Sequence, residues 1–453
     1  MAKNLPHPFV MLVLAALLVT AVTACTAAPT PTALPATAAA AILPESTPTL
    51  SVIAEAEPYP VIITTAVPPA YPAYPAVETE TAVPAQPTAS IPPPENGSYT
   101  FLPLITQADT LTETAVLAEP SPTNTLTPTP VPTVDFAAVK AQLQAQGQDI
   151  GYAKIGFHVG IGGNTEGLEQ WLRELDAAGV PFFLKSVDNA EPILFAQELM
   201  KASGVPHVLV YRKVSGGNHV SVPNYDQPPA EAAAAHWALH RDAFPPELDR
   251  NYVWVETMNE VDKNRSEWLA QFALEHARLT LQDGFKWAAF GWSSGEPEPE
   301  QWQAPSMMAF LRLVGSHPDR LAIALHEYSY LVDDITDAYP YKIGRFQELF
   351  RIADANGIPR PTVLITEWGW TYEHVPEPGP ALEDIAWASA LYAPYPQVKG
   401  AAIWYLGAGD TFADIANEAQ RLIDPVRVYA LTHYFAIPQP PEQQPINPAQ
   451  HQP

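Results

Sequence analysis

The stretch TVLITEW, from Thr362 to Trp368, decides the fold because an apolar run stops at a glutamate. Short apolar runs between turn residues are typical of parallel strands that are buried on both faces. Similar runs recur along the second two thirds of the chain, separated by segments with apolar residues at helical spacing. Eight such strand and helix units predict an α/β fold, a (β/α)8 TIM barrel, with a doubly wound open sheet as the alternative.

The other seven predicted strands lie on both sides of the middle of the barrel region. They are Lys154–Gly160, Pro181–Val187, His207–Val214, Tyr252–Glu260, Lys286–Trp292, Arg320–Tyr328 and Lys399–Leu406. Gly204 and Gly357 each stand two residues before a proline and just ahead of a strand, which is typical of a helix end. We expect the barrel domain to occupy residues 136–438.

The first residues have the pattern of an export signal. An apolar run from Phe9 to Val22 follows Lys3 and leads to small residues, which predicts a signal peptide over residues 1–24. The sequence VTAC ending at Cys25 resembles the lipobox of bacterial lipoproteins, which implies a lipid on this cysteine. Ordinary cleavage after Ala24, leaving a free thiol, is the alternative.

Residues 25–135 are dominated by proline, threonine and alanine, and much of the chain's total of 51 prolines falls here. Such tracts cannot bury a core and favour extended polyproline II, so we expect a disordered, semi-stiff linker. A proline- and glutamine-rich tail, residues 439–453, should be disordered as well. Together with Cys25, these segments predict an extracellular, membrane-anchored protein on the cell surface.

The charge balance restricts the partners. A formal net charge of -26 is the reverse of what nucleic-acid phosphates attract, so we expect no nucleic-acid partner. An acidic surface suits a neutral substrate such as an uncharged polysaccharide. Cys25 is the single cysteine, so the barrel must be stabilised by apolar burial.

Catalytic groups in such barrels stand at the carboxyl ends of strands. The fourth predicted strand ends in Asn259 and Glu260, and the seventh carries Glu367. In this arrangement the sequence resembles the clan A glycoside hydrolases, retaining TIM-barrel enzymes with an acid/base glutamate on strand four and a nucleophilic glutamate on strand seven. The resemblance implies a hydrolase that cleaves O-glycosidic bonds of a β-linked polysaccharide or oligosaccharide by double displacement, without a cofactor.

The resemblance also implies a set of substrate-binding residues. His326 and Tyr328 end strand six as in the clan's His-x-Tyr, Trp404 is similar to its sugar-stacking tryptophan, and Asn259 would hold the sugar 2-hydroxyl. Further aromatic residues fall at or just after strand ends and are expected to stack on sugar rings. They include Trp292 and Trp368, with Tyr330, Trp370 and Tyr405.

The two glutamates should titrate differently. We expect a drier setting and a neighbouring negative charge to raise the pKa of Glu260, the acid, while Glu367 stays ionised. The arginine that clan members place against the nucleophile has Lys185 and Arg212 as candidates. Either can instead pair with Glu256 inside the barrel, and such a structural role is expected for Glu256 itself.

Other motifs in the sequence give weaker support to other functions. The sequence GWSSG at Gly291–Gly295 matches a serine-hydrolase elbow, but Pro297 prevents the helix that must follow. Gly160–Gly163 lacks the lysine and the spacing of a phosphate loop. No second ligand stands at metal-site spacing from His326, so no metal is expected. A non-catalytic carbohydrate-binding or adhesion barrel is the alternative function.

Overall fold

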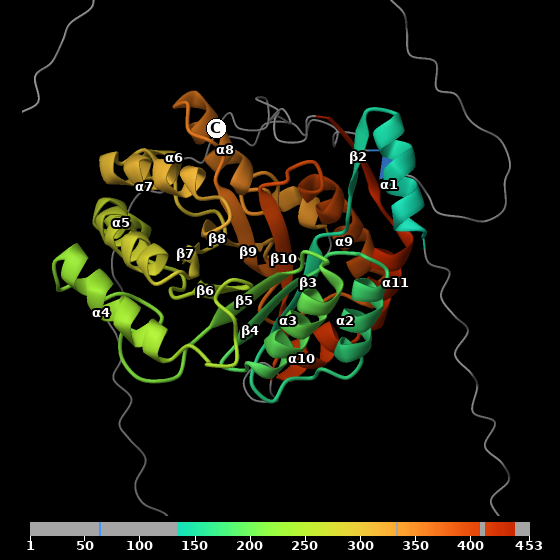
Figure 1. The fold of residues 1–453 in the computed structure, drawn as a ribbon, viewed down its shortest axis with the longest axis horizontal. Coiled ribbons are helices and arrows are strands. Elements are labelled where there is room, and N and C mark those ends of the chain that lie inside the picture. Colours follow the sequence, from blue (N-terminus) through green and yellow to red (C-terminus); the bar gives the residue numbers. More distant parts are fainter. Residues whose placement is uncertain (1–62, 65–133, 332–333, 408–412, 440–453) are drawn as a thin grey trace, which may run out of the picture. The chain divides into compact units, whose positions relative to one another are not determined.

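A computed structural model describes residues 63–64, 134–331, 334–407 and 413–439 of the 453-residue chain. Its centre is a closed barrel of parallel strands in the order β10-β3-β4-β5-β6-β7-β8-β9 (Figure 1). The predicted (β/α)8 barrel is confirmed, and each predicted strand coincides with one strand of the barrel. The strands are β3 (Ile155–Val159), β4 (Phe183–Val187), β5 (Val208–Arg212), β6 (Val253–Glu256), β7 (Lys286–Trp292), β8 (Leu321–Tyr328), β9 (Thr362–Gly369) and β10 (Val398–Leu406).

Helices surround the barrel, and successive strands are connected through them (Figure 1). The end of α3 at Gly204 shows the predicted cap, because this residue has a φ of 78° that glycine adopts without strain. The helices are α2 (Leu168–Ala177), α3 (Glu191–Ser203), α4 (Pro229–Asp242), α5 (Ser266–Gln282), α6 (Pro299–Trp302), α7 (Pro305–Ser316), α8 (Phe346–Ala355), α9 (Pro378–Tyr392), α10 (Ala413–Gln420) and α11 (Ile423–Thr432), with 3₁₀ turns at Lys263–Arg265 and Ile335–Ala338.

The strand residues alternate between two cores. Outward side chains such as Ile323 and Ile365 join the large apolar layer beneath the helices. Inward side chains at the lower part of the barrel form a small separate cluster that includes Phe183, Trp254 and Leu364. Above this apolar floor the inward positions are polar, which leaves charged groups at the carboxyl ends of the strands.

Two irregularities in the ladder change which side chains face inward. Between β8 and β9 the register shifts, so that Leu325 pairs with Ile365 but His326 pairs with Glu367. Between β7 and β8 it shifts after Ala289. An extra residue of this kind is a β-bulge, which re-aims the side chains that follow it. Glu367 consequently faces the barrel interior beside Thr366, and Trp368 faces the helices.

A small sheet outside the barrel was absent from the sequence-based prediction. The strand β2 (Gln148–Gly151) pairs antiparallel with β11 (Phe435–Pro438), which pairs in parallel with β1 (Ile63–Thr64). The helix α1 (Phe136–Ala145) precedes β2 and begins at the predicted domain boundary. The predictions for the signal peptide, Cys25, the tail after Gln439 and nearly all of the linker lie outside the described residues.

Among the described residues, no helix has both the length and the apolar character that a membrane span requires.

Candidate active site

Glu367 is held in the barrel mouth by polar groups from three other strands, β4, β5 and β8. The Tyr328 hydroxyl donates to Glu367 Oε2 over 2.9 Å, and Lys185 Nζ lies 3.2 Å from Glu367 Oε1. Arg212 Nη1 lies 3.4 Å from the same Oε1. The side chain of Glu367 is only 11% exposed, so these contacts replace most of its hydration.

Those neighbours decide the ionisation of the carboxyl group. Burial by itself would raise the pKa of Glu367, but electrostatic interactions with His326, Lys185, His158 and Arg212 outweigh burial and bring the pKa far below its usual value. Burial raises the pKa of Tyr328 well above its normal value, so its hydroxyl stays a donor. Glu367 is therefore an ionised carboxylate at neutral pH, as the sequence predicted.

A second carboxylate lies directly below it. Glu256 Oε2 is 2.6 Å from Lys185 Nζ, and both side chains are completely buried. Thr366 donates its hydroxyl hydrogen to Glu256 Oε1 over 2.6 Å. The structural role expected for Glu256 is confirmed, and Lys185 is shared between Glu256 and Glu367.

Glu260 stands on the loop that follows β6, beyond the strand itself. Its backbone has a φ of 45°, and its N–H donates to Gly291 O over 2.7 Å, which ties the loop to the bulge in β7. A side chain on Gly291 would collide with Met258 O at 2.9 Å, so this close approach requires glycine. His236 supports the loop from behind, with Nε2 3.0 Å from Thr257 O.

The prediction of a raised pKa for Glu260 is wrong for this structure. The side chain is 37% exposed, and His326 Nδ1 lies 3.3 Å from Glu260 Oε1. The hydrogen bond and positive charge of His326 lower the pKa of Glu260, against smaller opposing effects of burial and of Glu367. The sequence placed the negative charge of Glu367 beside Glu260, but it gave no sign that His326 would lie closer.

His326 lies between the two glutamates and sets a limit on their separation. Its Nδ1 is 3.3 Å from Glu260 Oε1 and 3.6 Å from Glu367 Oε2. Since both oxygens contact one nitrogen, these two oxygens lie no more than about 7 Å apart. The two predicted catalytic carboxyls therefore come together in the barrel mouth.

Asn259 and Arg212 form the next contact in the mouth. Arg212 Nη1 donates to Asn259 Oδ1 over 2.5 Å, while the Asn259 N–H donates to Ser221 O over 2.8 Å. The amide side chain of Asn259 is thus fixed beside the guanidinium that also reaches Glu367. The sequence predicted either Lys185 or Arg212 as the cation beside the nucleophile. In the structure both contact Glu367.

An aromatic cluster borders the glutamates, and Trp404 belongs to it. The Trp404 ring centroid lies 6.1 Å from that of Tyr328 and 6.0 Å from that of Tyr372. The hydroxyls of Tyr330 and Tyr372 are 2.9 Å apart, and Tyr372 is 42% exposed. Tyr372 was missed in the sequence because it stands three residues beyond the end of β9, in a loop without a motif.

Three of the predicted sugar-stacking residues are elsewhere. Trp292, Trp368 and Trp370 are all buried in the layer between the barrel and the helices. Trp292 packs edge-on against Trp302, and Trp368 donates its indole N–H to the Tyr392 hydroxyl over 3.1 Å. The same ladder shifts turn Trp292 and Trp368 outward, so neither presents a face at the mouth.

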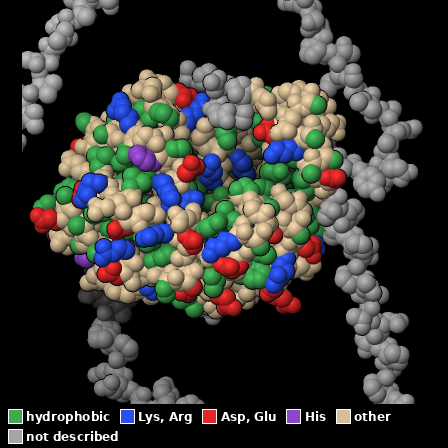
Figure 2. Space-filling view, in the orientation of Figure 1, with side chains coloured by type: hydrophobic (Ala, Val, Ile, Leu, Met, Phe, Trp, Pro, Cys, Tyr) green, Lys and Arg blue, Asp and Glu red, His purple; other side chains and the backbone are tan. Residues whose placement is uncertain are grey.

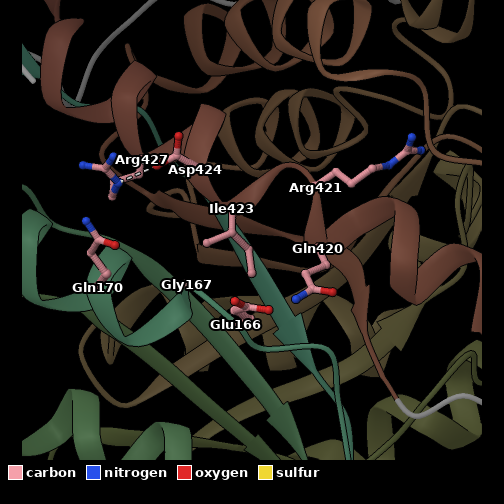
Figure 3. A pocket seen from close by; sticks show the side chains of 8 residues that line it. All are labelled: Glu166, Gly167, Gln170, Gln420, Arg421, Ile423, Asp424 and Arg427. Carbon is pink, nitrogen blue, oxygen red and sulfur yellow. Dashed lines mark hydrogen bonds and ion pairs between the residues drawn. The ribbon is translucent and has the colours of Figure 1, made fainter. Parts of the chain in front are cut away.

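The described residues around the mouth do not form a metal site, and a hollow elsewhere on the molecule is separate from them. Among the described residues, no group of three or more His, Cys, Asp or Glu side chains could hold a metal ion. A hollow of about 350 Å³ lies where α2 meets α10 and α11, with Glu166 and Arg427 at its edge (Figure 3). The carboxylate of Asp424 is paired with Arg427 there, and the candidate catalytic residues do not line this hollow.

Comparisons with known proteins give only distant similarities. No protein-family model and no curated protein sequence matches the chain. A glycoside hydrolase family 30 subfamily 8 xylanase from Clostridium acetobutylicum is 12% identical, with a TM-score of 0.36, over 59% of this chain and 67% of that chain. An endo-beta-1,4-glucanase from Xanthomonas axonopodis pv. citri is 15% identical, with a TM-score of 0.35, over 61% and 99%. The YdjI aldolase from Escherichia coli K12 is 11% identical, with a TM-score of 0.29, over 65% and 96%.

Proposed function

We propose that this protein is a retaining glycoside hydrolase that acts on a β-linked polysaccharide or oligosaccharide, with Glu367 as the nucleophile and Glu260 as the acid/base. The observation that carries the proposal is the pair of carboxyls that both contact His326 Nδ1 at the carboxyl end of the barrel. Glycosidic bond cleavage needs one carboxylate to attack the anomeric carbon and one acid to protonate the departing oxygen.

The closeness of the two carboxyls is compatible with retention. An inverting enzyme must fit a water molecule between the sugar and its base, which needs carboxyl groups about 6.5–9.5 Å apart, against about 5–5.5 Å in a retaining enzyme. Glu260 Oε1 and Glu367 Oε2 both contact His326 Nδ1 and lie within about 7 Å of each other, which leaves room for the shorter separation. Direct attack by Glu367, followed by hydrolysis of the glycosyl ester, suits this spacing.

Protonation of Glu260 depends on the bound sugar. In the free protein His326 keeps the pKa of Glu260 low and solvent reaches the carboxyl group. A sugar in the mouth would remove that solvent, which raises the pKa of a carboxyl group and favours the protonated acid. Once Glu367 carries the glycosyl group it has no negative charge, which lowers the pKa of Glu260 and keeps it ionised. The ionised Glu260 can then accept a proton from the attacking water molecule.

Hydrolysis of a panel of polysaccharides and aryl glycosides tests the proposal. The wild-type protein should release reducing sugar from at least one substrate, and Glu367→Gln should not. Glu373→Gln is the matched control, because Glu373 is an exposed carboxylate in the loop after β9. Binding of a glycan without hydrolysis, unchanged by Glu367→Gln, would instead support a non-catalytic carbohydrate-binding barrel.

We also propose that the protein is exported and anchored through a lipid on Cys25, with the proline-rich segment as a spacer. This proposal rests on the sequence alone. Mass spectrometry of the mature protein from a bacterial host should find a diacylglycerol thioether on Cys25, and Cys25→Ala should shift the protein from the membrane to the soluble fraction. An unmodified Cys25 thiol would contradict the proposal.

A further inference from the structure

The amino-terminal end of the barrel contains a cavity of about 450 Å³, on the side opposite to the glutamates. Lys154, Lys286 and Lys399 line it, above the apolar rings of Phe183 and Trp254. Figure 2 shows the molecule hollowed, with lysine or arginine side chains in the hollow. The chain has only 23 Lys plus Arg against 49 Asp plus Glu, so three lysines around one cavity are a local reversal of its charge.

Lys154 has a structural role at this end of the barrel. Its Nζ donates to Tyr392 O, Tyr395 O and Val398 O over 3.1, 2.8 and 2.9 Å. All three of its ammonium hydrogens are therefore used, and the residue fastens the turn between α9 and β10. Burial lowers the pKa of Lys154 to about 7, so it adds only part of a positive charge to the cavity at neutral pH, and it has no donor left for a ligand.

No comparable structural role is found for Lys286 and Lys399 among the described residues. Among the described residues, neither ammonium group has a hydrogen bond or a carboxylate within ion-pair distance. Lys286 Nζ lies 4.7 Å from the centre of the Trp254 ring. Burial lowers the pKa of both, that of Lys286 to about 8, so each ammonium group has lost part of its hydration without gaining a hydrogen bond from the described residues.

The neighbouring charged groups do not neutralise them. Asp319 is the one acid that raises the pKa of Lys399, and it also raises that of Lys286. Asp149 lines the cavity with its Oδ1 accepting the Ile150 N–H over 2.8 Å. Arg320 donates to Gly284 O and Asn251 Oδ1 and adds a further positive charge.

We propose that this cavity is a binding site for a small molecule with a phosphate or carboxylate group, held between Lys286 and Lys399. Lysine ammonium groups bind such oxyanions as point charges, and the apolar floor strengthens the attraction by excluding water. The cavity volume lies within the range of about 300–1,000 Å³ that is usual for small-molecule sites. The proposal is independent of the proposed glycosidase activity, because its test uses no glycan.

Thermal melts of the full-length protein at pH 7 and constant ionic strength test the site. Inorganic phosphate and glucuronate should each be compared with chloride, since they distinguish a phosphate from a carboxylate ligand. We expect at least one of them to raise the melting temperature by a few degrees and Lys286→Met/Lys399→Met to abolish the rise. Lys140→Met, which removes an exposed lysine of α1, should preserve it.

The stabilisation should weaken as the pH rises through about 8, because Lys286 then loses its proton. If the double variant does not fold, acylation of lysines in the wild-type protein gives the answer by peptide mass spectrometry. The anion should then slow modification of Lys286 and Lys399 but not of Lys140. Equal melting temperatures in phosphate, glucuronate and chloride, or an unchanged rise in the folded double variant, would overturn the proposal.

Discussion

The two ends of the barrel use the same residue type in different ways. At the carboxyl end, Lys185 contacts both Glu256 and Glu367, and Arg212 contacts Glu367 as well. At the amino end, Lys286 and Lys399 face no carboxylate within ion-pair distance among the described residues. The difference is that Lys185 is held by two carboxylates, whereas Lys286 and Lys399 have no direct ion-pair partner in the described part of the chain and are the groups we propose for a ligand.

The largest expected effect is at the carboxyl end. Glu367→Ala removes the attacking carboxylate and should lower kcat/KM by a factor on the order of 10⁴ or more. Azide is small enough to enter the space and attack from the same side, so it should restore turnover and give a product of inverted configuration. Steady-state kinetics with an aryl glycoside, with and without azide, measures both effects.

Glu260→Ala should fail in another way. Substrates with good leaving groups do not need an acid, so glycosylation of Glu367 should continue and azide should give a retained glycosyl azide. Poor leaving groups should show the full loss. The assignment of roles would be contradicted if azide gave products of the same configuration with both variants.

Lys185→Met should change both activity and stability. It removes one of the positive charges that lower the pKa of Glu367, so the acid limb of the pH–kcat/KM profile should move to higher pH. It also leaves Glu256 buried without its ion-pair partner, at a cost of about 3–5 kcal/mol in unfolding free energy. The additional change Glu256→Gln should recover part of that stability while the pH profile stays shifted.

If Lys185 only filled space, its replacement would lower stability without shifting the pH–kcat/KM profile. The combination of a restored melting temperature and a shifted profile therefore separates a positioning role from a packing role. A profile unchanged from wild type in the double variant would show that Lys185 does not influence Glu367.

Lys154→Met tests the amino-terminal end of the barrel and leaves the residues of the barrel mouth unchanged. It removes three hydrogen bonds and should lower the unfolding free energy by about 3 kcal/mol, since an ordinary hydrogen bond contributes about 1 kcal/mol. Measured well below the melting temperature, kcat should equal that of wild type. A large fall in kcat would mean that the two ends are coupled through the strands.

His276→Phe should produce the smallest effect, and only at acid pH. Burial, with repulsion from His236 and His240, holds the pKa of His276 well below its normal value, whereas the unfolded chain takes up a proton near pH 6.5. Stability is therefore lost as the pH falls below about 6.5, by about 1.4 kcal/mol per pH unit for each such histidine. Urea unfolding at pH 8 and pH 5 should show a shallower loss in the variant, and an equal loss would contradict this account.

The sequence was informative about the barrel because its strands are apolar and regularly spaced. The small outer sheet was missed because β2 is short and polar, and its partner β11 lies at the other end of the domain. Pairing over such a distance leaves no local pattern, since each of the two strands has only four residues.

The candidate site was predictable in its residues more than in their surroundings. Glu260 and Glu367 follow from their positions at strand ends, and Glu256 from the nearby cations. Trp292 and Trp368 were misplaced because two-residue alternation fails at the ladder shifts in β7 and β9. The lowered pKa of Glu260 depends on His326, and the geometry that joins β6 to β8 is set by tertiary packing.

The stereochemistry of the first product tests the central claim most directly. Proton NMR of wild-type hydrolysis of a β-glycoside, recorded before the released sugar mutarotates, distinguishes the anomers. The proposed attack by Glu367, with Glu260 as acid/base, predicts that the β-anomer appears first, by way of a covalent intermediate on Glu367. Initial formation of the α-anomer would contradict the account, because a water molecule rather than Glu367 would then have attacked the sugar.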